Sequence, residues 1–163
     1  IYRRHPETGA PLYAAEAALF GPLDPAEGGR VEALAAELHH LLSQADTGQL
    51  YAPLGLGRHV DHQLTRAVAE RLGRPLTFYE DYPYAARTPA GPAWDGLAAG
   101  CQPRLAEIDE QDLDFYCLAV GAYRSQLSTF WTDEAAMRAD VRGFCTRLAA
   151  GGLGLRLWDT QSA

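Results

Sequence analysis

The chain has 163 residues, enough for one domain with a hydrophobic core, and its 47% hydrophobic and 21% charged residues are ordinary for a globular protein. Its net charge of −7, without a basic patch, argues against a nucleic-acid partner. No signal peptide or membrane-length apolar run is visible, and Cys101, Cys117 and Cys145 form no C-x-x-C pair. We therefore expect free thiols, a reducing compartment and a cytoplasmic protein.

The first part of the chain predicts a long loop followed by a helix. Proline and glycine interrupt residues 1–30 so often that only a helical turn around Ala14–Phe20 is expected. Val31–Asp46 is predicted to be a helix because its apolar residues recur at helical spacing. They form one stripe: Val31, Leu34, Ala35, Leu38, Leu41 and Leu42.

The segment from Leu50 to Gly73 carries the candidate chemistry. It predicts a strand at Leu50–Pro53, a glycine-bearing loop at Leu54–Arg58 and a helix at about Val60–Leu72. His59, Asp61 and His62 occupy the junction of loop and helix, an H-x-D-H pattern. The positive end of a helix dipole disfavours imidazolium, and neutral imidazole is the form that binds a metal. The alternative interpretation is a helix cap with two partly exposed histidines.

A second strand is expected at Leu76–Tyr79, so that strand, helix and strand form a βαβ unit with a right-handed crossover. Glu80 and Asp81 then lie at the same edge of the sheet as the two histidines. They could bind sugar hydroxyls or support a histidine, or they could be turn-forming carboxylates before Pro83. Residues 81–103 are predicted to be a Pro- and Gly-rich loop beside the site that acts as a lid or a substrate wall. Its aromatic side chains would stack on sugar faces or, alternatively, only pin the loop to the core.

The C-terminal part predicts a strand at Arg104–Ile108, an N-cap at Asp109 and one helix that extends to Phe130. Thr132 is expected to cap a further helix, and Leu153–Trp158 to form the last strand. This order of elements predicts an α/β fold, a Rossmann-like three-layer α/β/α sandwich with a mostly parallel sheet, formed by residues 1–163 as a single domain.

The run YAPLGLGRHVDHQLTRAVAERLG, followed by FYEDYPYA, resembles the PIG-L/LmbE-like family of zinc-dependent N-deacetylases. The resemblance is dense over residues 50–85. It continues more thinly at Tyr123–Gln126, at Leu157-Trp158 and in the opening segment IYRRHPETGAPLYAAEAALFGPL.

This resemblance implies metal-assisted hydrolysis of an amide, with Zn²⁺ or another divalent metal as cofactor. His62 would be a zinc ligand, and His59 would stabilise the oxyanion or give a proton to the leaving amine. Asp61 would orient His59. Arg3, Arg58, Glu80 and Asp81 are the further candidates, as substrate-binding residues.

The sequence departs from the family pattern at its beginning. The family's H-P-D-D motif supplies two more ligands and the general base. His5-Pro6-Glu7 does not qualify, because no apolar strand precedes it and the next residue is Thr8. We therefore expect these residues to belong to a longer polypeptide with an N-terminal segment that completes the site. The loop tyrosine of some family members is also missing from Leu54–Arg58, which puts a tyrosine-assisted step in doubt.

Three hypotheses follow. The first is a zinc-dependent deacetylase that acts on an N-acetylated amino sugar or glycoconjugate. The second is a catalytically silent relative that binds a glycan or metabolite. The third is an unrelated metal hydrolase whose metal shell is completed by other residues of this chain, for which His5 is badly placed. The oligomeric state, including a homo-oligomer, stays open.

Overall fold

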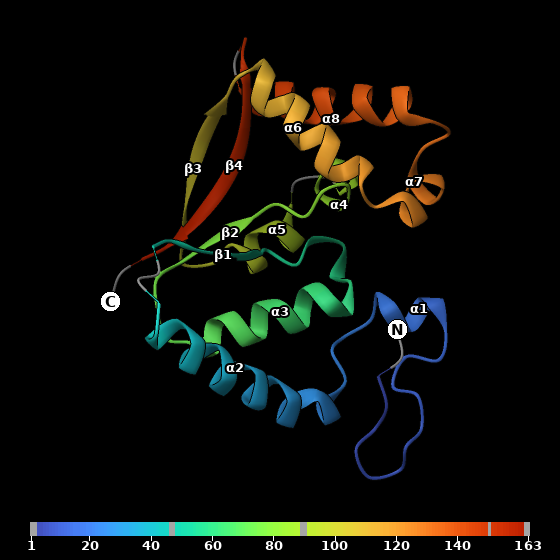
Figure 1. Cartoon of the computed structure of the whole chain (residues 1–163), viewed down its shortest axis with the longest axis vertical. Helices are drawn as coiled ribbons and strands as arrows, with labels where there is room; N and C mark the ends of the chain where they lie inside the picture. Colours follow the sequence, from blue (N-terminus) through green and yellow to red (C-terminus); the bar gives the residue numbers. More distant parts are fainter. Residues whose placement is uncertain (1–2, 46–47, 89–90, 150, 162–163) are drawn as a thin grey trace. The chain divides into compact units, whose positions relative to one another are not determined.

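The computed structural model describes residues 3–45, 48–88, 91–149 and 151–161. The chain divides into two compact units, Ile1–Gln102 with Trp158–Ala163, and Pro103–Leu157. Figure 1 labels the elements. The helices are α1 (Glu16–Leu19), α2 (Gly28–Ser43), α3 (Val60–Arg71), α4 (Tyr84–Arg87), α5 (Pro92–Leu97), α6 (Glu110–Gly121), α7 (Arg124–Phe130) and α8 (Glu134–Leu148), with 3₁₀ turns η1 (Pro25–Glu27) and η2 (Leu56–Arg58); the strands are β1 (Leu50–Pro53), β2 (Leu76–Tyr79), β3 (Cys101–Ile108) and β4 (Leu153–Thr160).

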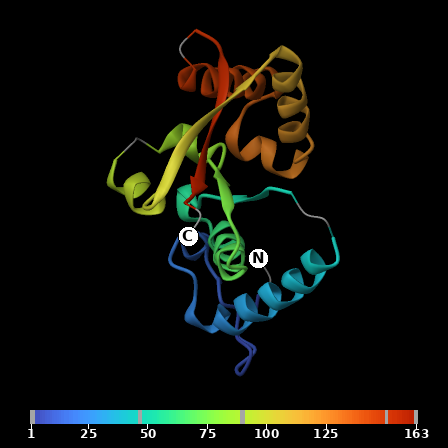
Figure 2. The same cartoon turned by 90° about the vertical axis from the view of Figure 1, so that its left-hand side faces the viewer.

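The strands form one sheet in the order β1-β2-β4-β3, which makes β1 an outer strand of the described sheet. β1 and β2 are parallel, with Leu50 opposite Leu76 and Pro53 opposite Tyr79. β3 and β4 run in opposite directions (Figure 2), because β4 begins at the end of the sheet where β3 ends. The predicted α/β class is confirmed, but the prediction of a mostly parallel sheet is wrong, since the sheet is mixed. The three-layer arrangement and the single domain stay predictions.

In the larger unit, α2 and α3 pack against each other on the same side of β1 and β2 (Figure 1). Their shared core consists of Val31, Ala35 and Val68, with three partly buried neighbours around it. In the two strands, Ala52 and Phe78 are both almost fully buried. The loop between β1 and α3 is therefore held at both of its ends by packed elements.

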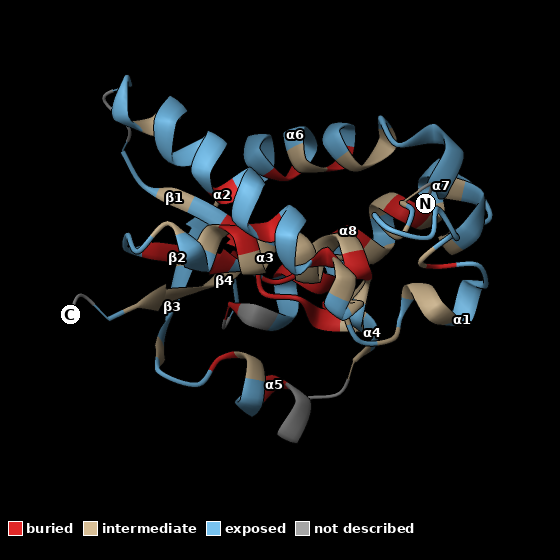
Figure 3. Cartoon of the chain, turned by 90° about the horizontal axis from the view of Figure 1, so that it is seen from below, coloured by how far each residue is buried: buried red, intermediate tan, exposed pale blue. Residues whose placement is uncertain are grey.

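Helix α2 buries less of its apolar stripe than its pattern predicts. It runs over Gly28–Ser43, so it starts three residues earlier and ends before Asp46, which lies outside the described residues. Figure 3 shows most of α2 as exposed. Leu34, Leu38 and Leu41 have 37%, 39% and 54% of their surface exposed. The periodicity therefore identified the helix correctly, while three leucines of its apolar face are only partly covered by the described residues.

The smaller unit contains helices whose ends differ from the prediction. Asp109 caps α6 as expected, in a capping box with Asp112. The single predicted helix is broken between α6 and α7, where Tyr123 leaves the helical conformation at φ −80° and ψ 55°. The cap of α8 is Asp133, whose carboxylate accepts a hydrogen bond from the backbone N–H of Ala136, and not Thr132. The core of this unit includes Leu113, Cys117, Met137, Val141 and Cys145.

The three cysteines are free thiols, as predicted. Burial raises the pKa of the Cys145 thiol to about 11, so this thiol is neutral and unreactive near neutral pH. Among the described residues, no helix combines the length and the apolar character needed to cross a bilayer.

Candidate functional site

The site is built on the loop that follows β1. The hydrogen bond from Leu54 N–H to the carbonyl of Tyr79 (2.9 Å) extends the β1–β2 pairing by one residue. Gly55, Gly57 and Arg58 then have φ values of 90°, 76° and 58°, all in the left-handed region. The predicted loop therefore contains the tight turn η2, which delivers His59 to the start of α3.

Asp81 lies at the end of β2 with a fully buried carboxylate. Its Oδ2 accepts hydrogen bonds from the backbone N–H groups of Gly55 (2.7 Å) and Leu56 (2.9 Å). Its Oδ1 lies 2.6 Å from Nδ1 of His62. A buried carboxylate needs such partners, because desolvation without them is costly. The predicted meeting of the acids after β2 with the histidines of α3 is confirmed for Asp81.

His62 stands in the first turn of α3, with 33% of its side chain exposed to solvent. Because an ionised carboxylate only accepts hydrogen bonds, the ring proton facing Asp81 belongs on Nδ1. In a neutral ring the lone pair is then on Nε2, the atom available to a ligand. The ring is therefore neither enclosed in the apolar interior nor walled off from solvent.

His59 is the N-cap of α3 and not part of the helix, with φ −61° and ψ 130°. Its Nδ1 accepts a hydrogen bond from the backbone N–H of Asp61 (3.3 Å), which assigns the proton of the neutral ring to Nε2. The Asp61 carboxylate lies 3.8 Å from the same nitrogen, too far for a hydrogen bond. Asp61 thus orients His59 through its backbone. Burial is the largest cause of the lowered pKa of His59. The Asp61 carboxylate acts in the opposite direction and raises this pKa, while His62 and Arg3 lower it by smaller amounts. The net effect is a lowered pKa, so the neutral form of His59 is favoured.

This lowered pKa predicts a pH dependence of stability in the metal-free protein. His59 takes up a proton less readily in the folded chain than in the unfolded chain. As the pH falls below about 6.5, the unfolded chain therefore binds more protons than the folded chain. The stabilisation by neutral His59 is complete above that value and is lost as the pH falls from there toward the lower folded pKa. Urea unfolding at about pH 7.5 and 5.5 should show a smaller loss of unfolding free energy for His59→Asn, which keeps an N-cap side chain, than for the unchanged protein. Equal losses in the two proteins would contradict this assignment.

Arg3 reaches the site from the opening segment and is engaged by acids. Its guanidinium forms ion pairs with Asp61 and with the buried Glu27, and it lies 5.1 Å from the ring centre of Tyr13. Arg30 holds the second oxygen of Glu27 at 2.9 Å. Glu27 could not be predicted from the sequence, because nothing in the local pattern of η1 marks it as a buried partner. Arg3 therefore fixes Asp61, and its contact with substrate stays a prediction.

Four aromatic rings contact one another in a closed cycle at the site. Phe20 and His59 are 5.4 Å apart between ring centres, His59 and His62 5.4 Å, His62 and Tyr84 5.7 Å, and Tyr84 and Phe20 6.1 Å. Phe20 keeps 40% of its surface exposed. Tyr84 comes from residues 81–103. The prediction that this segment is a loop is wrong in part, because it includes the short helices α4 and α5. No local sequence signal marks Phe20, which closes the cycle from the end of α1.

Glu80 and Arg58 are the two remaining candidate residues. Glu80 is buried, and its Oε1 accepts a hydrogen bond from the indole of Trp158 (3.1 Å), so it ties β2 to β4. Arg58 is exposed beside His59, and its carbonyl accepts a hydrogen bond from Gln63. Gln63 also donates to the carbonyl of Gly21 (2.8 Å), which holds the Phe20 segment against the loop.

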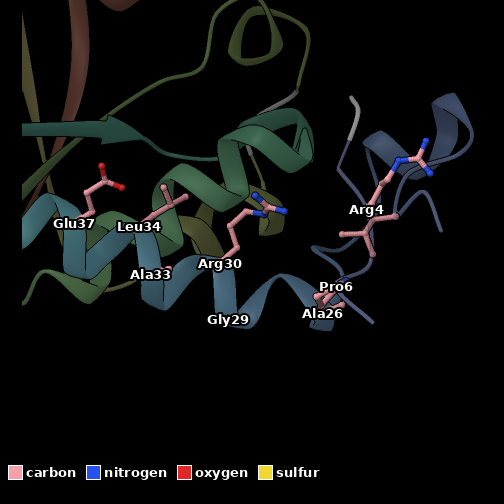
Figure 4. A pocket seen from close by; sticks show the side chains of 9 residues that line it. Arg4, Pro6, Ala26, Gly29, Arg30, Ala33, Leu34 and Glu37 are labelled. Carbon is pink, nitrogen blue, oxygen red and sulfur yellow. The ribbon is translucent and has the colours of Figure 1, made fainter. Parts of the chain in front are cut away.

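Two surface hollows occur elsewhere in the larger unit, and neither is lined by His59 or His62. One, of about 360 Å³, lies between the opening segment and α2, with Arg4, Pro6 and Arg30 among its walls (Figure 4). The other, of about 520 Å³, is an apolar groove between α2, α3 and β1, lined by leucines and Tyr51.

Within the described residues, no three His, Cys, Asp or Glu side chains gather closely enough to hold a metal ion together. His62 fits a metal ligand by itself, since its Nδ1 is held by a carboxylate in the way usual for zinc-binding histidines. A catalytic zinc site usually needs three protein ligands. The described residues therefore fit part of such a site, and only part.

No family model and no curated protein matches the chain. Its structure is similar to crystal structures of deacetylases, three of which follow. The zinc-inhibited form of teicoplanin deacetylase Orf2 gives a TM-score of 0.75 at 20% identity, over 98% of this chain and 63% of that one. A deacetylase–teicoplanin complex gives 0.71 at 19% identity, over 100% and 64%. The A40926 pseudoaglycone deacetylase Dbv21 gives 0.66 at 23% identity, over 83% and 60%. The chain spans 60–64% of the length of these proteins, and at this identity the likeness establishes that it shares their fold.

Proposed function

We propose that this chain is the larger part of a metal-dependent N-deacetylase, an amide hydrolase that removes an acetyl group from an amino sugar of a glycoconjugate. The observation that carries the proposal is the His62–Asp81 pair: a solvent-reaching imidazole held at 2.6 Å by a fully buried carboxylate, at the carboxyl edge of two parallel strands. The shared fold with deacetylases supports the same reaction class.

His62 would hold the metal through Nε2. Zinc, when bound, would polarise the acetyl carbonyl and lower the pKa of a bound water. His59 has its proton on Nε2 in the neutral ring, and its lowered pKa favours that form, which suits it to donate a hydrogen bond to an oxyanion. To give a proton to the leaving amine, the ring would first have to take up a second proton at Nδ1 and act as imidazolium. Asp61, fixed by Arg3, would keep His59 in this orientation through its backbone N–H.

The remaining metal ligands and the general base are placed by this proposal in polypeptide beyond residues 1–163. β1 is an outer strand, and Tyr51 on it is 57% exposed. Parallel strands are normally flanked and covered on both faces, and an open apolar edge is a liability. The groove of about 520 Å³ beside β1, lined by the exposed leucines of α2, is the kind of surface that a further strand and helix would cover. A strand added parallel to β1 would end next to the loop that precedes His59 and His62, where ligands are needed.

The proposed substrate is an N-acetylated sugar on a larger molecule. The similar crystal structures described above include a deacetylase–teicoplanin complex and the A40926 pseudoaglycone deacetylase. The exposed face of Phe20 beside His59 is apolar and suits the carbon face of a sugar or an acyl group. Arg58, exposed next to His59, is the candidate for a polar contact with the substrate.

A second candidate function is a catalytically silent relative that binds a glycan or metabolite. The contact between the rings of Phe20 and Tyr84, which offers a stacking surface for a sugar without any metal, favours it. Such a protein would keep the aromatic wall of Phe20 and Tyr84, and would bind the sugar without releasing acetate.

One experiment separates these functions. The full polypeptide is isolated, its metal content is measured by mass spectrometry, and acetate release from N-acetylglucosamine derivatives is followed with and without a chelator. The proposal predicts about one zinc per chain and acetate release that stops on chelation and returns with zinc. Sugar binding without acetate release in the zinc-loaded protein would support the silent relative instead.

A further inference from the structure

We propose that Asp81 is a positioning residue that fixes the tautomer of His62, and thereby makes Nε2 the metal-binding atom. The inference rests on the proposed function for the identity of the ligand. The tautomer itself can be measured without any metal, so the two ideas can fail separately.

The two oxygens of Asp81 have different partners. Oδ2 is held by two backbone donors, Gly55 N–H at 2.7 Å and Leu56 N–H at 2.9 Å. Both donors are backbone groups of the turn after β1. Oδ1 is then left facing Nδ1 of His62 at 2.6 Å. Because the carboxylate is fully buried, water does not compete for either oxygen. The backbone of the turn therefore sets the rotation of the carboxylate, and the carboxylate sets the protonated nitrogen of His62.

The arrangement makes Asp81→Asn an informative change. The two backbone N–H groups require an acceptor, so the amide oxygen of asparagine must take the place of Oδ2. The amide NH₂ group then faces His62 and can only donate to Nδ1. The ring would have to carry its proton on Nε2 instead, the nitrogen proposed to bind the metal. The variant keeps the shape of the turn and reverses the hydrogen bond to the histidine.

Asp159 offers a matched control in the same unit. It is a carboxylate on β4 that accepts a hydrogen bond from the hydroxyl of Thr77 on β2. This hydrogen bond joins two strands and does not involve His62, while the change Asp159→Asn is chemically the same as Asp81→Asn. An effect confined to Asp81→Asn therefore comes from the contacts of Asp81 itself, with His62 or with the turn after β1, and the tautomer of His62 separates the two.

The first measurement is the ¹⁵N NMR spectrum of the imidazole nitrogens in metal-free protein, at a pH where the ring is neutral, with His62→Gln to assign the signals. We expect the unchanged protein and Asp159→Asn to show the Nδ1–H tautomer of His62, and Asp81→Asn to show the Nε2–H tautomer. An Nε2–H tautomer in the unchanged protein would overturn the proposal, and this result does not depend on how any variant folds.

The second measurement is zinc affinity by competition with a chromophoric chelator, on the full polypeptide. Loss of a carboxylate behind a zinc-binding histidine typically weakens metal binding about 10–100-fold, so this loss is expected for Asp81→Asn and not for Asp159→Asn. Unchanged affinity in Asp81→Asn would overturn the proposal. If the unchanged protein shows the Nδ1–H tautomer and binds no zinc, the positioning by Asp81 stands and the proposed function fails.

Discussion

His62→Ala is expected to reduce acetate release by on the order of 10³-fold, because it removes a metal ligand outright. Loss of a residue that only supports a ligand typically costs about 10–100-fold. The buried carboxylate of Asp81 would also lose a partner, at a cost of about 1–3 kcal/mol of unfolding free energy. Zinc content by mass spectrometry and turnover by acetate assay test the first effect, and urea unfolding tests the second.

His39→Ala is the control for this prediction, since His39 is an exposed residue of α2. It should leave metal content, turnover and stability unchanged. Full zinc occupancy together with full activity in His62→Ala would show that the metal is bound elsewhere, and the ligand assignment would be wrong.

Gly57→Ala is expected to destabilise the protein by about 3 kcal/mol, through backbone strain and overpacking together. Gly57 has φ +76°, a conformation that residues with a Cβ rarely adopt. A Cβ at this position would lie 2.7 Å from Cβ of Tyr84 and closer still to Cγ. These atoms are next to the backbone of α4, so the ring cannot simply swing away. Chemical denaturation measures the loss.

Gly73 provides a matched comparison, because it has φ +62° and an added Cβ there would meet no atom within 4 Å. Gly73→Ala should therefore cost only the backbone strain, about 1 kcal/mol. Similar losses for the two variants would mean that the contact between Gly57 and Tyr84 does not exist in solution. A larger loss for Gly57→Ala, with reduced turnover, would place Tyr84 firmly against the turn that carries His59.

The strands and the helix around the site could be predicted closely from the sequence. Leu50–Pro53 and Leu76–Tyr79 have the predicted bounds, and α3 ends one residue before the predicted end. These elements are short apolar or periodic runs bounded by glycine and proline, which are the strongest local signals. The meeting of Asp81 with His62 followed from the same pattern, since parallel strands end at one edge.

The features that the sequence could not predict depend on contacts between distant segments. The ion pairs of Arg3 with Glu27 and Asp61 join residues that are 24 and 58 positions apart. The position of Phe20 beside His59 depends on how the opening segment folds back. The direction of β4 relative to β3 is likewise decided by the path of the chain through α6, α7 and α8, and not by the residues of the strand.

The exposed leucines of α2 show how a correct pattern can give an incomplete answer. The stripe of Leu34, Leu38 and Leu41 correctly indicated an amphipathic helix. A sequence pattern shows which face is apolar, and it does not show what covers that face. The proposal that further polypeptide pairs with β1 would account for both the exposed leucines and the incomplete metal site.

The most direct test of the account is a crystal structure of the zinc-loaded full polypeptide, with anomalous data collected at the zinc edge. We predict one anomalous peak about 2.0–2.1 Å from Nε2 of His62, with Nδ1 of the same ring still on Asp81. A fully occupied zinc bound without His62, or bound through Nδ1 with Asp81 turned away, would contradict the claim that His62 binds the metal through Nε2.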